Sequence, residues 1–157
     1  TPLYSSAASD VYKRQELAGL DALASEPVKG TRVIPLQVAG AFHTSYMASV
    51  VAALRDAVAT VTPADPQITL WSNRDGSVVA DGAQALSHLV DQVSSPVRWD
   101  LCMASFADHG ITGLIELAPA GALTGLAKRG LRGVPSVAVK TPDDLDAAVA
   151  LLNGEAA

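Results

Sequence analysis

A single histidine stands where a strand-like segment gives way to a helical one. His43 follows the apolar run 33–38 and precedes residues 44–61, in which apolar side chains recur every three or four positions. Thr44 is a candidate N-cap for that helix. Because histidine is the side chain best suited to exchange a proton near neutral pH, His43 is a candidate general base. A capping or surface histidine is the alternative explanation of the same position.

Three stretches of the sequence resemble the motifs of one enzyme family. They are VAGAFHT at 38–44, DQVSSPVRW at 91–99 and LIELAPAGALTGL at 114–126. In order and separation they are similar to motifs of the malonyl-CoA:acyl-carrier-protein transacylases, with actinobacterial members the most similar. One departure is Ala118, which stands where many members have glycine. The resemblance covers residues 32–140.

The resemblance implies an α/β fold in two parts. Residues 40–157 resemble the C-terminal part of the α/β-hydrolase-like acyltransferase domain, and residues 16–39 resemble a remnant of its inserted ferredoxin-like subdomain. Residues 1–15 match nothing in the family, and we expect them to be disordered or an artefact of a truncated N-terminus. The residues themselves also favour an α/β layer with mostly parallel strands, because strand candidates alternate with helices. The strand candidates are 32–38, 68–72, 78–79, 111–117 and 134–139.

Helix starts and buried faces can also be predicted from the residues. Asp81 is placed to cap a helix, and Thr141-Pro142 followed by two acids is typical of a helix start. Two apolar stripes predict core packing: Trp99, Cys102, Met103 and Phe106 in one helix, and Leu145, Ala148, Val149 and Leu152 in the last one.

Composition excludes several classes of protein. The 157 residues are 49% hydrophobic and carry a formal charge of −5, which argues against a basic nucleic-acid-binding face. No apolar run has the length of a membrane span. The single cysteine, Cys102, cannot form an internal disulfide and fits a reducing compartment, so we expect a cytoplasmic protein. The three histidines lack metal-ligand spacing, so no metal site is predicted.

The resemblance implies acyl transfer through a seryl intermediate. A serine in a Gly-x-Ser-x-Gly elbow attacks malonyl-CoA, and the phosphopantetheine thiol of acyl carrier protein then takes the malonyl group. By motif match His43 is the base, and the backbone carbonyl of Gln92 accepts from its Nδ1–H to fix the tautomer. The residues alone slightly favour the alternative that Gln92 is an ordinary polar residue at a helix end. Acyl carrier protein and malonyl-CoA are the implied partners, and no cofactor is implied.

Phe42 has two interpretations. In related acyltransferases a bulky residue beside the histidine resembles a wall that excludes an α-methyl branch, which implies a preference for malonyl over methylmalonyl. Such a wall discriminates by about 1–3 kcal/mol per methyl-sized group. Alternatively, Phe42 is a core residue.

The sequence lacks the rest of the catalytic apparatus. It contains no Gly-x-Ser-x-Gly, no Gly-Gln-Gly-Ser-Gln segment, and no arginine in the context that pairs with the malonate carboxylate. In the family all three precede the histidine, so we expect this chain to be a C-terminal half that is inactive alone. Two other hypotheses stay open: the acyltransferase domain of a polyketide synthase, and a non-catalytic α/β interaction module. The final helix followed closely by the chain end argues for a stand-alone protein over the synthase domain.

Overall fold

The computed structural model describes residues 17–34 and 40–155. The chain divides into two compact units, Thr1–Cys102 and Met103–Ala157, and the division falls within helix α5 (Trp99–Asp108). The expectation for residues 1–15 lies outside the described residues, and so do residues 35–38 of the strand predicted at 32–38; residues 32–34 are described and are not in a strand. Among those described, no helix has the length and apolar character to cross a membrane.

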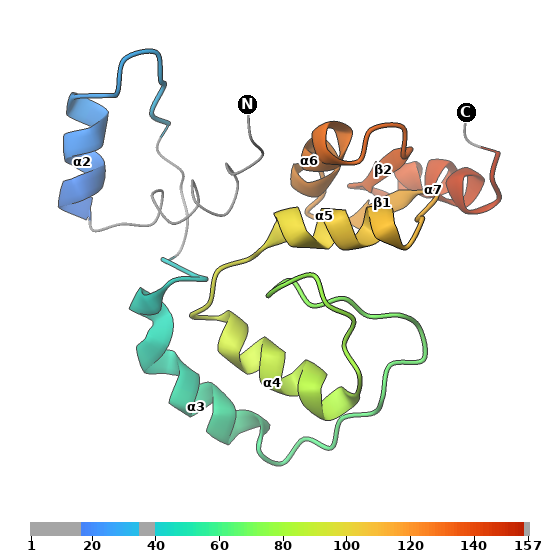
Figure 1. Ribbon diagram of the computed structural model, residues 1–157, viewed down its shortest axis with the longest axis horizontal. Helices are drawn as coiled ribbons and strands as arrows, with labels where there is room; N and C mark the ends of the chain where they lie inside the picture. The colour runs from blue at the N-terminus through green and yellow to red at the C-terminus, as the bar shows by residue number, and fades with distance from the viewer. Residues whose placement is uncertain (1–16, 35–39, 156–157) are drawn as a thin grey trace. The chain divides into compact units, whose positions relative to one another are not determined.

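The regular secondary structure described in the first unit is mainly helical. Helix α2 spans Leu17–Ser25. The helix predicted after Thr44 begins as a 3-10 turn, η1 (Ser45–Met47), and continues as α3 (Ala48–Val58). Helix α4 spans Gly82–Gln92, and the Asp81 carboxylate caps it by accepting from Gln84 N at 2.7 Å. Figure 1 shows α3 and α4 side by side.

Helices α3 and α4 are joined by an ion pair at their surface. Arg55 Nη2 lies 2.9 Å from Asp91 Oδ1, near the C-terminal end of each helix. No residue of α3 is fully buried, so its apolar stripe is only partly covered. Because both charged groups are substantially exposed, this pair adds little to stability, about 0–1 kcal/mol.

The strand predicted at 68–72 is reduced to a single bridge. Trp71 pairs antiparallel with Val78 across the turn at 73–76. Gly76 closes the turn at a φ of 74°, and a Cβ there would lie 2.5 Å from the Leu101 carbonyl oxygen. Glycine is therefore required at this position by both conformation and space.

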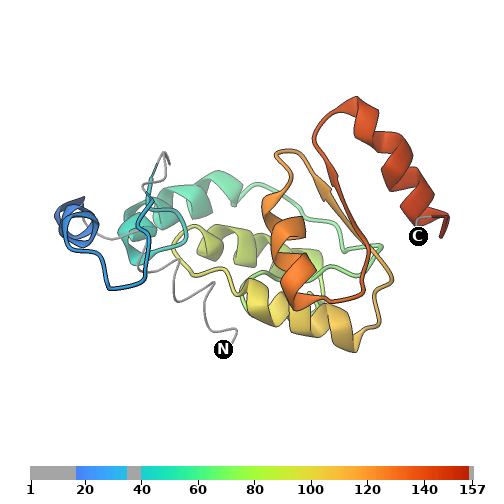
Figure 2. The ribbon, with the colours of Figure 1, turned by 90° about the horizontal axis from the view of Figure 1, so that it is seen from above.

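The second unit is a parallel strand pair with helices. Strand β1 (Leu114–Leu117) pairs in parallel with β2 (Ser136–Val139), with Leu114 opposite Ser136. Helices α6 (Ala122–Gly130) and α7 (Leu145–Leu152) lie on opposite sides of the two strands (Figure 2). A 3-10 turn, η2 (Pro142–Asp144), leads into α7. The α/β class and the parallel pairing are confirmed by this unit.

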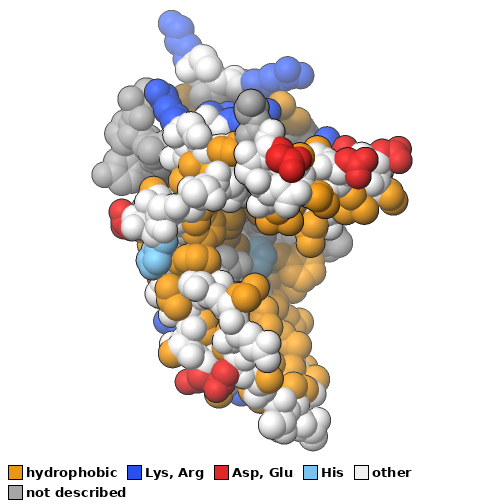
Figure 3. All heavy atoms as spheres, turned by 90° about the vertical axis from the view of Figure 1, so that its right-hand side faces the viewer, with side chains coloured by type: hydrophobic (Ala, Val, Ile, Leu, Met, Phe, Trp, Pro, Cys, Tyr) orange, Lys and Arg blue, Asp and Glu red, His pale blue; other side chains and the backbone are white. Residues whose placement is uncertain are grey.

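The predicted buried face of the last helix is wrong in part. Of its four residues only Ala148 is buried, and Leu152 is 75% exposed. The reason is that α7 packs mainly against β2, so one narrow side of the helix is covered. Similarly, Cys102 is the one fully buried member of the α5 stripe. Hydrophobic side chains are accordingly visible in the space-filling view (Figure 3).

Glu116 on β1 caps helix α6. Its side chain is buried, with 7% exposed, and its carboxylate accepts from the backbone N–H of Gly121, Leu123 and Thr124 at 2.9–3.0 Å. Burial alone would raise the pKa of this carboxyl, but these hydrogen bonds outweigh it and lower the pKa from 4.5 to about 2. The carboxylate thus satisfies amides at the positive end of the helix.

We predict that Glu116→Gln lowers the free energy of unfolding by about 2–3 kcal/mol near neutral pH, because an amide offers one acceptor oxygen to three donors. The folded-state pKa lies below the unfolded one, so the carboxylate's contribution is complete above pH 4.5 and is lost as pH falls toward 2. Urea unfolding of the parent chain and of Glu116→Gln across that pH range measures the difference in the free energy of unfolding. Glu155→Gln, at an exposed glutamate of the same unit, is the control; equal losses in the two variants would contradict the prediction.

Candidate functional site

His43 is attached at two points to the C-terminal end of α4. Its backbone N–H donates to the carbonyl oxygen of Val93 at 2.8 Å. Its ring Nδ1 lies 2.8 Å from the carbonyl oxygen of Gln92. The ring is half-buried. These two contacts join segments 49 residues apart in the sequence and fix both the backbone and the imidazole of His43.

The hydrogen-bond partner determines which ring nitrogen carries the proton. A carbonyl oxygen can only accept, so the neutral His43 ring must donate from Nδ1–H. Nε2 then keeps its lone pair and is the nitrogen that could take a proton from another group. The geometry is therefore that of an oriented imidazole base whose orienting partner is uncharged.

The backbone at His43 has an unusual conformation. Its φ is +64°, and it is the one non-glycine residue with positive φ among those described. The left-handed region costs a side chain energy, although histidine is among the residues found there more often. Thr44 follows in extended conformation and its hydroxyl caps η1, accepting from Tyr46 N at 3.3 Å, as the N-cap prediction required. The corner thus turns sharply at His43 and starts the helix immediately afterwards.

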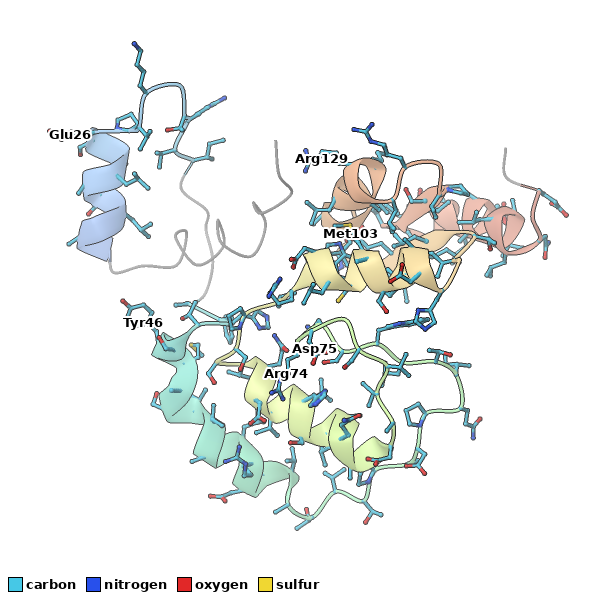
Figure 4. All side chains as sticks on the ribbon, viewed as in Figure 1. Glu26, Tyr46, Arg74, Asp75, Met103 and Arg129 are labelled. Atoms are coloured by element: carbon cyan, nitrogen blue, oxygen red, sulfur yellow. The ribbon has the colours of Figure 1, made fainter. Side chains whose placement is uncertain are left out.

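Phe42 is not a core residue. Its side chain is 44% exposed, so the alternative explanation of this residue as part of the core is wrong. Phe42 directly precedes His43 in the sequence. Its ring lies close to Gly40, because a Cβ added at Gly40 would be 3.4 Å from Phe42 Cε2. Tyr46, a second exposed aromatic side chain, projects from the N-terminal end of the same helical segment (Figure 4).

The other two histidines lie elsewhere. His88 is half-buried within α4. His109 is exposed just after α5, with Nδ1 2.7 Å from the Ser105 carbonyl oxygen. Gly110 follows at a φ of 65°, a conformation typical of a glycine at a helix end. Within residues 17–34 and 40–155, no three His, Cys, Asp or Glu side chains are grouped to hold a metal ion.

Cys102 is buried and carries no sign of a reactive thiol. Its Sγ lies 3.5 Å from the Ser72 carbonyl oxygen. Burial, followed by the negative charges of Asp100 and Asp75, raises its pKa, so the thiolate is disfavoured.

Sequence reasoning missed the turn that follows Gln92. The side-chain amide of Gln92 donates to the carbonyl oxygens of Ser95 and Pro96 at 3.0 and 3.1 Å. No periodicity or capping pattern marks this arrangement. The short spacing from glutamine to proline in residues 92–96 is the one signal that could have suggested it.

Known proteins resemble this chain over most of its length. No protein-family model matches it. It is 48% identical over 145 residues to the malonyl CoA-acyl carrier protein transacylase of Mycobacterium tuberculosis, covering 92% of this chain and 48% of that protein. The crystal structure of MCAT from Mycobacterium tuberculosis matches with a TM-score of 0.77 and 50% identity, covering 85% of this chain and 44% of that one.

A third match is a complex. PlMCAT:AntF (holo), a type II PKS acyl-carrier protein in complex with its malonyl-transacylase, gives a TM-score of 0.72 at 26% identity, over 87% of this chain and 42% of that chain. The chain thus spans about half the length of the curated relatives it matches.

We predict that the conformation of His43 separates two substitutions that both remove the ring. His43→Asn should fold more stably than His43→Val by about 1–2 kcal/mol, because asparagine tolerates positive φ and a β-branched residue does not. Both variants lose the imidazole, and His43→Ala, which has neither a donor nor a branched Cβ, separates the backbone cost from a hydrogen bond made by the asparagine amide. Urea unfolding measures it, and equal stabilities would show that the left-handed conformation carries no cost.

Proposed function

This chain belongs to the malonyl-CoA:acyl-carrier-protein transacylase family, fatty-acid biosynthesis acyltransferases, and we propose that it contributes the histidine half of such an enzyme. The reaction moves a malonyl group from malonyl-CoA to a serine and then to the phosphopantetheine thiol of acyl carrier protein. The observation that carries the proposal is the 2.8 Å contact from His43 Nδ1 to the Gln92 carbonyl oxygen.

In this proposal His43 acts twice as a base. Nε2 takes the proton of the serine hydroxyl as the oxygen attacks the thioester, and the coenzyme A thiolate leaves with that proton. Nε2 then takes the proton of the phosphopantetheine thiol as its sulfur attacks the seryl ester, and the serine oxygen recovers it. The bonds formed and broken balance, and the ring is neutral at the end of each half-reaction.

Gln92 has a passive role in this chemistry. Its carbonyl oxygen fixes the ring tautomer through Nδ1–H, as an aspartate does in a protease triad. A neutral acceptor stabilises the imidazolium less than a carboxylate would. A thioester is a reactive substrate, so such a base suffices.

The serine must come from polypeptide outside these 157 residues. None of the glycines in this sequence begins a Gly-x-Ser-x-Gly motif. The chain matches about half of its relatives' length, which supports a division of the catalytic groups between two halves of the fold. We further propose that residues 40–157 are the C-terminal part of the acyltransferase domain and that residues 16–39 are a remnant of the inserted subdomain.

The partners follow from the same family. One related transacylase has been solved with its acyl-carrier protein, which supports carrier protein as the partner here. A solvated helix end is the ordinary explanation of basic residues near a helix C-terminus, and a contact with an acidic carrier protein is the alternative. Three exposed cations lie at or just after the end of α6, and Arg129 projects away from that helix (Figure 4). They are Lys128, Arg129 and Arg132. The buried, reduced Cys102 is consistent with the cytoplasm as the compartment.

A chimera tests the proposal. We predict that the isolated chain takes no covalent label from radioactive malonyl-CoA, because it has no nucleophile in an elbow. Fused to the preceding N-terminal portion of the M. tuberculosis relative, it should be labelled and should transfer malonyl to holo-acyl carrier protein. His43→Gln in the chimera should lower that transfer about 10²–10⁴-fold, the usual contribution of a general base.

His88→Gln is the matched control, since it removes a second histidine of the same unit to which the proposal gives no role, and its rate should be unchanged. Stable label on the isolated chain would contradict the division of catalytic groups. A His43→Gln chimera as fast as its parent would contradict the role of His43 as general base. A parent chimera that folds but is inactive would favour the hypothesis of a non-catalytic interaction module.

Phe42 is proposed as the wall of the acyl pocket. We predict that Phe42→Ala in the chimera raises the rate with methylmalonyl-CoA relative to malonyl-CoA by about 10-fold or more, the value of one methyl-sized group. Tyr46→Ala, at the neighbouring exposed aromatic side chain, should leave the ratio unchanged. Competition between the two labelled thioesters measures this ratio of rates. An unchanged ratio for Phe42→Ala would contradict the role of Phe42 as a pocket wall.

A further inference from the structure

The end of helix α4 is closed by the side chain of its own last residue. Gln92 is 6% exposed, and its amide nitrogen donates to the carbonyl oxygens of Ser95 at 3.0 Å and Pro96 at 3.1 Å. Two donors of one NH2 group therefore bind two consecutive carbonyls of the following turn. This arrangement holds residues 92–96 in a single conformation.

The same residue presents its backbone carbonyl to His43. The Gln92 carbonyl oxygen accepts from Ser95 N at 3.2 Å and lies 2.8 Å from His43 Nδ1. Helix ends leave their last carbonyls without intrahelical donors, so their direction depends on what the following turn does. Here the turn that sets this direction is the one that the Gln92 amide closes.

The amide is retained at a cost. Gln92 Oε1 is buried and has no hydrogen-bond partner among the described residues. A buried acceptor without a donor is unfavourable, and an apolar side chain of similar length would avoid that penalty. An apolar side chain would, however, leave the Ser95 and Pro96 carbonyls without the two hydrogen bonds that hold the turn, so those two bonds offset the cost.

We infer that the Gln92 side chain is a positioning residue for His43: by closing the 92–96 turn it aims its own backbone carbonyl at Nδ1 and so holds the ring in the tautomer that leaves Nε2 unprotonated. The catalytic meaning of this tautomer rests on the proposed function, but the tautomer itself does not. The backbone carbonyl and the side-chain amide of one residue thus have separate tasks.

A residue that only capped the helix would affect stability and leave the ring unchanged. The tautomer distinguishes these roles, because imidazole nitrogen shifts differ strongly between a protonated and an unprotonated nitrogen. The sequence holds three histidines, which single His→Gln variants assign in a chain labelled with nitrogen-15 histidine. His109, whose Nδ1 lies 2.7 Å from the Ser105 carbonyl oxygen, serves as an internal reference.

The experiment compares the full chain with Gln92→Met and Gln92→Asn. In the parent chain, above the pH at which the rings titrate, His43 should show the pattern of a single Nδ1–H tautomer. In both variants the two nitrogen shifts of His43 should move toward the average of two exchanging tautomers, and those of His109 should stay. Gln67→Met, at an exposed glutamine in the same unit, should change neither.

Retention of the single-tautomer pattern in either folded variant would overturn the inference. Loss of the folded state in both variants would overturn it too, because the amide would then support the fold and not the ring. Neither result depends on malonyl transfer. A failure of the chimera described above would therefore remove the proposed function while leaving the positioning of His43 by Gln92 intact, and the reverse also holds.

Discussion

Two hydrogen bonds between His43 and the end of α4 are the constraint on which the candidate site depends. Consecutive carbonyls, those of Gln92 and Val93, accept from the ring and from the backbone of the same histidine. The backbone contact holds the corner at a φ of +64°, and the ring contact fixes which nitrogen is protonated. If either carbonyl pointed elsewhere, the imidazole would lose a contact that fixes its orientation.

Each unit of the chain uses unsatisfied groups at a helix end. At the C-terminal end of α4 the free carbonyls of Gln92 and Val93 accept from the ring and the backbone N–H of His43. At the N-terminal end of α6 the free amides bind the Glu116 carboxylate. Both follow from the same property of helices, which leave donors at one end and acceptors at the other. The negative charge suits the amide end, and the donor groups suit the carbonyl end.

Predictions from the sequence were confirmed for local features and were less accurate where the result depends on which elements pack together in space. The Asp81 and Thr44 caps, the helices and the parallel strand pair follow from patterns within a few residues. The stripe on α7 predicted a buried face that includes Leu152, which is exposed because only one narrow side of this helix meets β2. The strand at 68–72 is reduced to one bridge, which is flanked by backbone hydrogen bonds from Ser72 N to the Ser77 carbonyl and from Val79 N to the Leu70 carbonyl.

The sequence by itself determined the α/β class, the helix starts, the family resemblance and the choice of His43 and Gln92, because these depend on residue types at short or recurring spacings. The tertiary structure alone decided how the site is built. The positive φ of His43, the aim of the Gln92 carbonyl and the amide contacts that close its turn arise between segments that lie 49 residues apart or within an irregular turn. Hydrogen bonds of that kind leave no periodic pattern in a sequence, because they depend on where two distant segments of the chain meet in space.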